Sequence, residues 1–69
     1  MNVKNVKELA KIIRQTRKEQ KLTQAQLAAA SGVGVRFIVD LENGKETCQI
    51  AKTIRIVKML GLNIEISSN

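Results

Sequence analysis

The chain has 69 residues and a formal net charge of +6, since 12 Lys and Arg stand against 6 Asp and Glu. It contains no His, Trp, Tyr or Pro, so the commonest general base and metal ligand is missing, and neither an enzyme nor a metal or cofactor site is expected. The positive charge favours a polyanionic partner. The single cysteine, Cys48, cannot form an intrachain disulfide, which fits a reducing cytoplasm. The sequence has no signal-peptide core and no apolar run near the roughly 20 residues of a membrane helix, so one small cytoplasmic domain is expected.

The first predicted helix begins after Asn5 and runs to about Gln20. Asn5 fits an N-cap with Glu8 at the third helical position, and apolar residues recur at helical spacing from Val6 to Ile13. The polar side of this helix is strongly basic, with Lys4, Lys7, Lys11, Arg14, Arg17, Lys18 and Lys21. These cations form either a solvated face or a surface that partly contacts phosphate.

A second helix is predicted to begin at Gln24. Thr23 and Gln26 have the spacing of a capping box, in which the hydroxyl accepts from a free backbone N–H and the amide reaches back to the cap residue. Leu22 before the cap and Leu27 inside the helix supply the matching hydrophobic staple. The start of this helix is therefore indicated on two independent grounds.

A glycine turn separates this helix from a third one. Gly32 ends the second helix, because a sharp turn usually needs a residue at positive φ, and Val33 fills the turn. Ile38 and Leu41 lie at i, i+3 and are expected to be buried, and Asn43-Gly44 closes the third helix. Two short helices around a glycine turn are typical of a helix-turn-helix that reads DNA.

A last helix is predicted after the Lys45-Glu46 loop, with Thr47 as its N-cap and Gly61 at its end. Its inward stripe is expected to be Ile50, Thr53, Ile54, Val57 and Leu60. Ile56 and Met59 fall at the margin of this stripe or outside it, which leaves apolar surface for another chain.

Residues 62–66 alternate apolar and polar side chains, which predicts a β-strand with one buried face. Since no other segment has this pattern, we expect the strand to pair with its copy in a second subunit about a two-fold axis. The alternative is a frayed tail whose isoleucines cover the core. In the dimer, the contacting residues are expected to be Met59, Leu62, Ile64 and Ile66.

The spacing of Leu27-Ala28, Gly32-Val33, Ile38 and Leu41-Glu42-Asn43-Gly44-Lys45 resembles the Xre/Cro-repressor type of helix-turn-helix protein. This resemblance, which covers nearly the whole chain, implies an all-α, lambda-repressor-like bundle of four to five short helices that binds double-stranded DNA. The division then expected is a helix-turn-helix domain at 1–61 and a dimerisation strand and tail at 62–69.

Two further segments, 31–38 and 60–66, are similar to those of HipB-like antitoxins, which are DNA-binding partners of Hip-type serine/threonine kinase toxins. This second resemblance implies an antitoxin that represses its own operon and binds such a kinase. Two other functions stay open, namely a free-standing, phage-like repressor and a protein-interaction module on the same scaffold.

The resemblance implies that the third helix enters the major groove with Gly34, Val35, Arg36, Val39 and Asp40. Arg36 suits guanine O6 and N7 through two hydrogen bonds, and the valines suit thymine methyl groups. Asp40 either accepts from a cytosine amino group or pairs with Arg36 and orients it. Gly34 either allows close backbone approach or only caps the helix.

Phosphate contacts are expected at two places, the start of the second helix and the end of the third. Helix N-termini present free donors and partial positive charge, which suits Thr23 and Gln24. In the resembled family, the positions of Asn43, Gly44 and Lys45 form a second phosphate clamp. The two contacts together would fix the register of the domain on the duplex.

Arg17 continues the inward row of the first helix. In the resembled family, an arginine at this position pairs with the glutamate that matches Glu42, and this pair ties the first helix to the end of the recognition helix. The alternative for Arg17 is a phosphate contact. We expect the structural ion pair.

Overall fold

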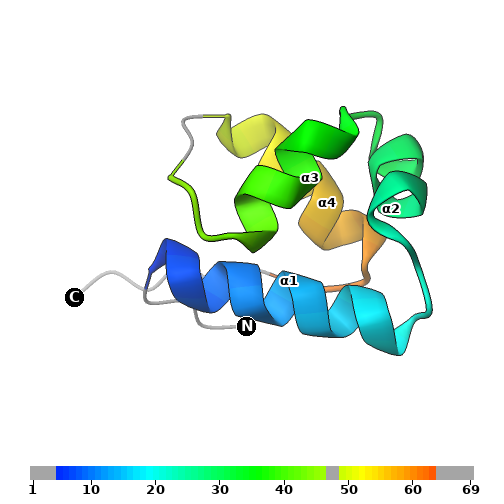
Figure 1. Cartoon of the computed structure of the whole chain (residues 1–69), viewed down its shortest axis with the longest axis horizontal. Coiled ribbons are helices and arrows are strands. Elements are labelled where there is room, and N and C mark those ends of the chain that lie inside the picture. Colours follow the sequence, from blue (N-terminus) through cyan, green and yellow to red (C-terminus); the bar gives the residue numbers. More distant parts are fainter. Residues whose placement is uncertain (1–4, 47–48, 64–69) are drawn as a thin grey trace.

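A computed structural model describes residues 5–46 and 49–63 of the chain, and this part contains four helices. These are α1 (Val6–Glu19), α2 (Gln24–Ser31), α3 (Val35–Glu42) and α4 (Ile50–Met59) (Figure 1). The predicted all-α class is confirmed, and the described residues include no strand. The predicted strand, with Ile64 and Ile66, lies mostly outside the described residues.

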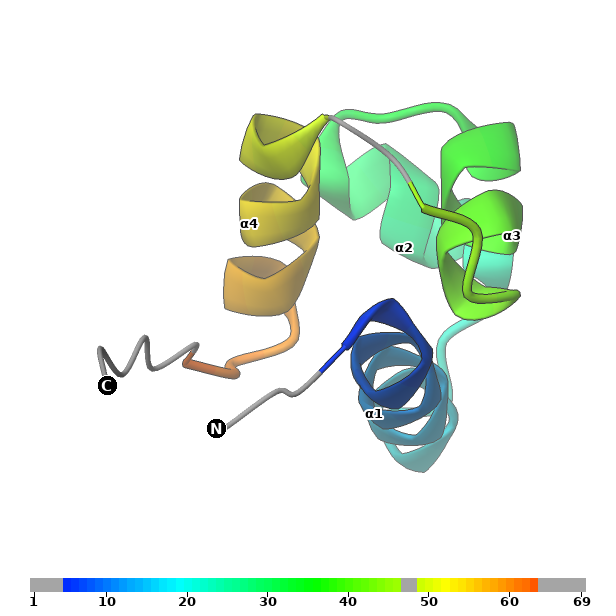
Figure 2. The same ribbon diagram turned by 90° about the vertical axis from the view of Figure 1, so that its left-hand side faces the viewer.

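The longest helix, α1, lies along one side of the other three (Figure 1). Figure 2, which looks nearly along α1, shows α3 and α4 on opposite sides of the molecule with α2 between them. α2 packs against both α3 and α4, and α1 packs against α3. Consequently α3 has one face on the core and one face directed outward.

The predicted starts of α1 and α2 are confirmed by their hydrogen bonds. Oδ1 of Asn5 accepts from the backbone N–H of Glu8 at 2.9 Å, which caps α1. Thr23 Oγ1 accepts from the N–H of Gln26 at 3.0 Å, and Gln26 Oε1 accepts from the N–H of Thr23 at 2.8 Å. Gly32 adopts a left-handed conformation with φ 69°, so the turn between α2 and α3 has the geometry that requires glycine.

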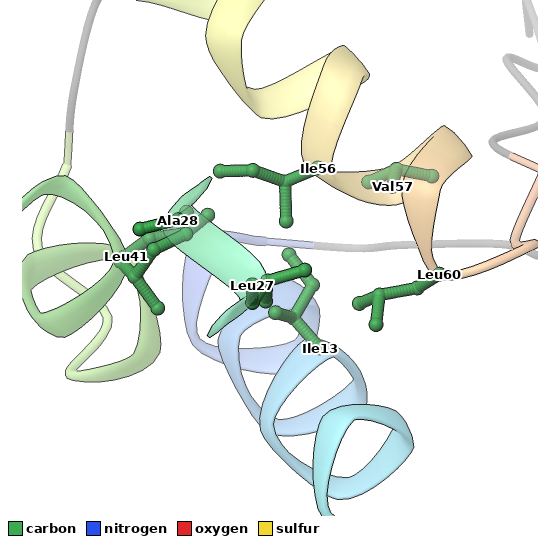
Figure 3. Close-up of a cluster of buried hydrophobic side chains, with 8 residues drawn as sticks. Ile13, Leu27, Ala28, Leu41, Ile56, Val57 and Leu60 are labelled. Carbon is green, nitrogen blue, oxygen red and sulfur yellow. The ribbon is translucent and has the colours of Figure 1, made fainter. Parts of the chain in front are cut away.

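The core draws on all four helices. Its members are aliphatic side chains with little or no exposure to solvent, namely Ile13, Leu27, Ala28, Ile38, Leu41, Ile56, Val57 and Leu60 (Figure 3). Burying each of the larger ones contributes about 1.5–3 kcal/mol relative to exposure. The core therefore packs against the face of α3 that carries Ile38 and Leu41 and leaves the opposite face of α3 uncovered.

The predicted inward stripe of α4 is partly wrong. Ile56 is completely buried, whereas Ile50 and Ile54 are 70% and 38% exposed. The helix begins at Ile50 with Gln49 at its N-cap, and Thr47 lies outside the described residues. The sequence pattern is compatible with two rows of apolar residues on this helix, and packing against α2 selects the row that contains Ile56.

Polar contacts between described residues help to attach α4 to the rest of the domain. Gln20 Nε2, just after α1, donates to the carbonyl oxygen of Leu60 at 2.8 Å. Lys52 places its ammonium nitrogen 5.6 Å from the centre of the Phe37 ring, a cation–π contact between α4 and α3. No helix in the described ranges is long and apolar enough to cross a membrane.

Candidate nucleic-acid interface

The outer face of α3 presents the side chains of its N-terminal half. Val35 is 48% exposed, and the side chain of Arg36 is 83% exposed. Arg36 Nε lies 3.4 Å from Asp40 Oδ1 one helical turn later, and Lys45 Nζ lies 3.7 Å from Asp40 Oδ2. Asp40 therefore has the geometry of an orienting partner for Arg36, while the other guanidinium nitrogens of Arg36 remain available to a ligand.

Gly34 is the N-cap of α3, where no side chain accepts from the first turn. Its φ of −73° and ψ of 150° are open to any residue, and a Cβ placed there would meet no atom within 4 Å. The fold itself thus places no demand for glycine at this position. Val39, the next proposed reading residue along the helix, is half-buried.

Arg17 and Glu42 form a buried ion pair that joins α1 to α3. Arg17 Nε and Nη2 donate to Glu42 Oε2 and Oε1 at 2.6 and 3.0 Å, while the two side chains are only 10% and 2% exposed. Arg17 Nη1 also donates to the carbonyl oxygen of Leu22 at 2.8 Å. This bidentate geometry suits a guanidinium and a carboxylate that have both lost water.

The side chain of Gln24 joins this ion pair, a contact that we did not expect from the sequence. Its Nε2 donates to Glu42 Oε1 at 3.2 Å, so α1, α2 and α3 all meet at one carboxylate. The bond keeps the start of α2 close to the end of α3. At that start, the first backbone N–H groups of α2 have no acceptor within the helix and can therefore donate to other groups. A short polar contact between residues 18 positions apart has no local sequence signal.

Because of this bond, the two predicted phosphate contacts lie at the same end of α3. Gln24, which follows Thr23 in the chain, contacts Glu42, and Asn43, Gly44 and Lys45 follow Glu42 directly. Asn43 and Lys45 are exposed, and Gly44 has φ 78°. Val35 and Arg36 lie at the opposite, N-terminal end of α3, whereas Asp40 lies near this end and is ion-paired with Lys45.

The residues assigned to dimer contacts differ in their surroundings. Met59 is 48% exposed on α4, whereas Leu62 is partly buried against the core of its own chain. The backbone N–H of Leu62 donates to the carbonyl oxygen of Val57 at 3.0 Å. Ile64 and Ile66 lie outside the described residues.

Nothing in the described part of the chain has the side chains of a metal site, since no group of three or more His, Cys, Asp or Glu residues comes together there. α2 and α3 are joined by the turn at Gly32, and α3 packs on the core with one face while its other face is exposed. This arrangement is a helix-turn-helix of the kind that binds DNA.

Comparison with known proteins agrees with this class. Residues 13–66 match the family HTH_3, described as helix-turn-helix, and the chain belongs to that family. It is also 47% identical over 64 residues to a protein of Sinorhizobium fredii (strain NBRC 101917 / NGR234) named "Uncharacterized HTH-type transcriptional regulator y4mF", a match that covers 93% of this chain and 84% of the relative. The chain is thus a DNA-binding transcriptional regulator of the helix-turn-helix type and not an enzyme.

Proposed function

We propose that the protein is a sequence-specific repressor that binds an inverted-repeat operator in double-stranded DNA as a homodimer. The observation that carries the proposal is the state of Arg36, which is 83% exposed on the outer face of α3 and lies 3.4 Å from an orienting carboxylate. A guanidinium held in this way suits guanine O6 and N7. Gly34, Val35, Val39 and Asp40 complete the proposed reading surface.

The proposed phosphate contacts position this surface on the duplex. Thr23 and Gln24 supply the N-terminal end of α2, and Asn43, Gly44 and Lys45 supply the turn after α3. Because Gln24 and Glu42 are hydrogen-bonded, the two groups would grip neighbouring parts of the DNA backbone as one unit.

The homodimer is proposed from the apolar surface that one chain leaves uncovered. Ile50, Ile54 and Met59 on α4 are exposed, and residues 62–66 carry the alternating pattern of a strand. A two-fold pair of recognition helices separated by about 34 Å would read two half-sites in successive turns of the major groove. Occupying a promoter in this way excludes polymerase and needs no further chemistry.

The operator is best found by selecting bound duplexes from random DNA with the wild-type protein. Arg36→Ala should bind the selected operator roughly 5- to 150-fold more weakly, as expected when a bidentate contact to guanine is lost. Arg55→Ala, which removes an exposed arginine from α4, is the control and should bind like wild type. If Arg36→Ala bound the operator as tightly as the control, the proposed reading surface would be wrong.

The dimer is tested separately by ending the chain after Asn63. Leu62 packs on the core, so the shortened chain keeps every described core residue. We expect a monomer in sedimentation analysis at micromolar concentration, compared with a dimer for the full chain. A shortened chain that stayed dimeric would refute pairing through the strand predicted at 62–66 and would leave the exposed apolar residues of α4 as the interface.

We further propose an antitoxin role, in which the repressor acts on its own operon and binds a Hip-type kinase toxin. This extension is supported by the resemblance of 31–38 and 60–66 to HipB-like antitoxins. Affinity capture of the tagged protein from its native host, followed by nuclease treatment and a high-salt wash, should recover a kinase in stoichiometric amount. Recovery of the protein alone would favour a free-standing repressor, and failure to select any DNA would favour an interaction module.

A further inference from the structure

A basic groove runs along α1 and ends at the turn after α3. One wall carries Lys7, Lys11, Arg14 and Lys18, which follow one another at intervals of four, three and four residues and so share one face of the helix. The other wall is Glu42, Asn43 and Gly44, and the groove has a volume of about 700 Å³. We refer to these four cations and this space as the α1 groove.

The ion pairs of the described residues do not include these four cations. All four are exposed, and no ion pair joins them to a carboxylate within residues 5–46 and 49–63. Glu42, on the opposite wall, already accepts from Arg17 and Gln24, which leaves Glu19 at the end of the groove as the other acidic neighbour. Like charges at these helical spacings repel one another, so an anionic occupant would stabilise them.

The groove is continuous with the proposed phosphate clamp. Asn43 and Gly44 belong to both, and a Cβ built on Gly44 would lie 3.5 Å from Cγ of Lys7, so the start of α1 is in direct contact with the turn. From Lys7 to Lys18 the helix rises about 16 Å, at about 1.5 Å per residue. A DNA strand rises about 3.4 Å per nucleotide, so this length corresponds to several consecutive phosphates.

We propose that the α1 groove binds backbone phosphates that flank the operator half-site, outside the base pairs that α3 reads. This inference rests on the proposed function, because it assumes that α3 lies in the major groove. The continuity with Asn43 and Gly44 favours DNA over an acidic protein as the occupant. The groove thereby adds affinity and lengthens the footprint without adding base contacts.

The test compares Lys11→Gln/Arg14→Gln with the matched control Arg55→Gln/Lys58→Gln, which removes the same charge from α4. Each protein is titrated at several salt concentrations with the selected operator, either alone or extended by about 8 base pairs on each side. For wild type and control, the slope of log Kd against log salt should be steeper on the extended duplex. The Lys11/Arg14 variant should lose about two units of slope there, and roughly thirtyfold in affinity near 0.15 M salt.

The variant should also unfold at or above the temperature of the wild type, because removing repulsion does not weaken the fold. An unchanged slope on the extended duplex would overturn the inference while leaving the proposed function intact. Failure of the wild type to select any operator would overturn both proposals.

Discussion

Replacing Arg17 with Met tests whether the buried ion pair holds the domain together. The change removes both guanidinium bonds to Glu42 and leaves a carboxylate that is 2% exposed with the amide of Gln24 as its remaining described donor. Methionine has nearly the length of the arginine stem, so the packing changes little. The change therefore measures the cost of an unpaired buried charge together with the loss of the hydrogen bond from Arg17 Nη1 to the carbonyl oxygen of Leu22.

The expected loss is about 3–5 kcal/mol, the cost of breaking a buried pair by removing one partner. A chain of this length has about 4–10 kcal/mol of stability in total, so the variant should lose about a third of it or more. The unfolding temperature should fall by at least about 12 °C. Replacing both partners, as Arg17→Met/Glu42→Leu, should restore most of the loss, because no buried charge then remains.

Unfolding in urea, followed by circular dichroism, measures these free energies, and the double-mutant cycle gives the coupling between the two side chains. Lys18→Met is the control, since it removes an exposed cation from the adjacent position of α1 and should change stability by less than about 0.5 kcal/mol. A loss below about 1 kcal/mol for Arg17→Met, or a double variant no more stable than the single one, would refute this reasoning.

The same unfolding measurements check three further predictions. Gly32→Ser should cost about 1–2 kcal/mol because φ is 69° there, whereas Gly34→Ser should gain about 0.5–1 kcal/mol by capping α3 at an allowed φ. Ile56→Ala should cost about 2–5 kcal/mol and Ile54→Ala at most about 1 kcal/mol, and equal losses would contradict the observed orientation of α4. Thr23→Ala should cost about 0.5–2 kcal/mol through loss of the capping box, and no loss would mean that the cap does not stabilise α2.

Local features of the fold follow from the sequence because their causes are local. A capping box needs only Thr23 and Gln26, and a left-handed turn needs only Gly32, so each can be recognised within a few residues. The orientation of α4 is different, since Ile54 and Ile56 fit the pattern of an amphipathic helix equally well. Only the position of α2 decides between them, and this position depends on the whole fold.

The candidate interface shows the same division. The exposed position of Arg36 follows from the helical spacing of Ile38 and Leu41, which are buried on the opposite side. The bond from Gln24 to Glu42 joins distant parts of the chain and leaves no periodic trace in the sequence. The cations of the α1 groove recur at helical spacing, so the sequence predicts that they share one face of α1. The proximity of this face to Gly44 becomes apparent only in the structure.

The meeting of three helices at the carboxylate of Glu42 has a consequence for DNA whose bases the protein does not touch. If phosphates bind beside Gln24 and Asn43, about 10 Å of rigid helix lies between them and Arg36, at about 1.5 Å per residue. The depth of Arg36 in the major groove is then set by the protein, and the duplex must adjust its groove width and twist to match. Operators would therefore be ranked also by how easily their uncontacted base steps deform.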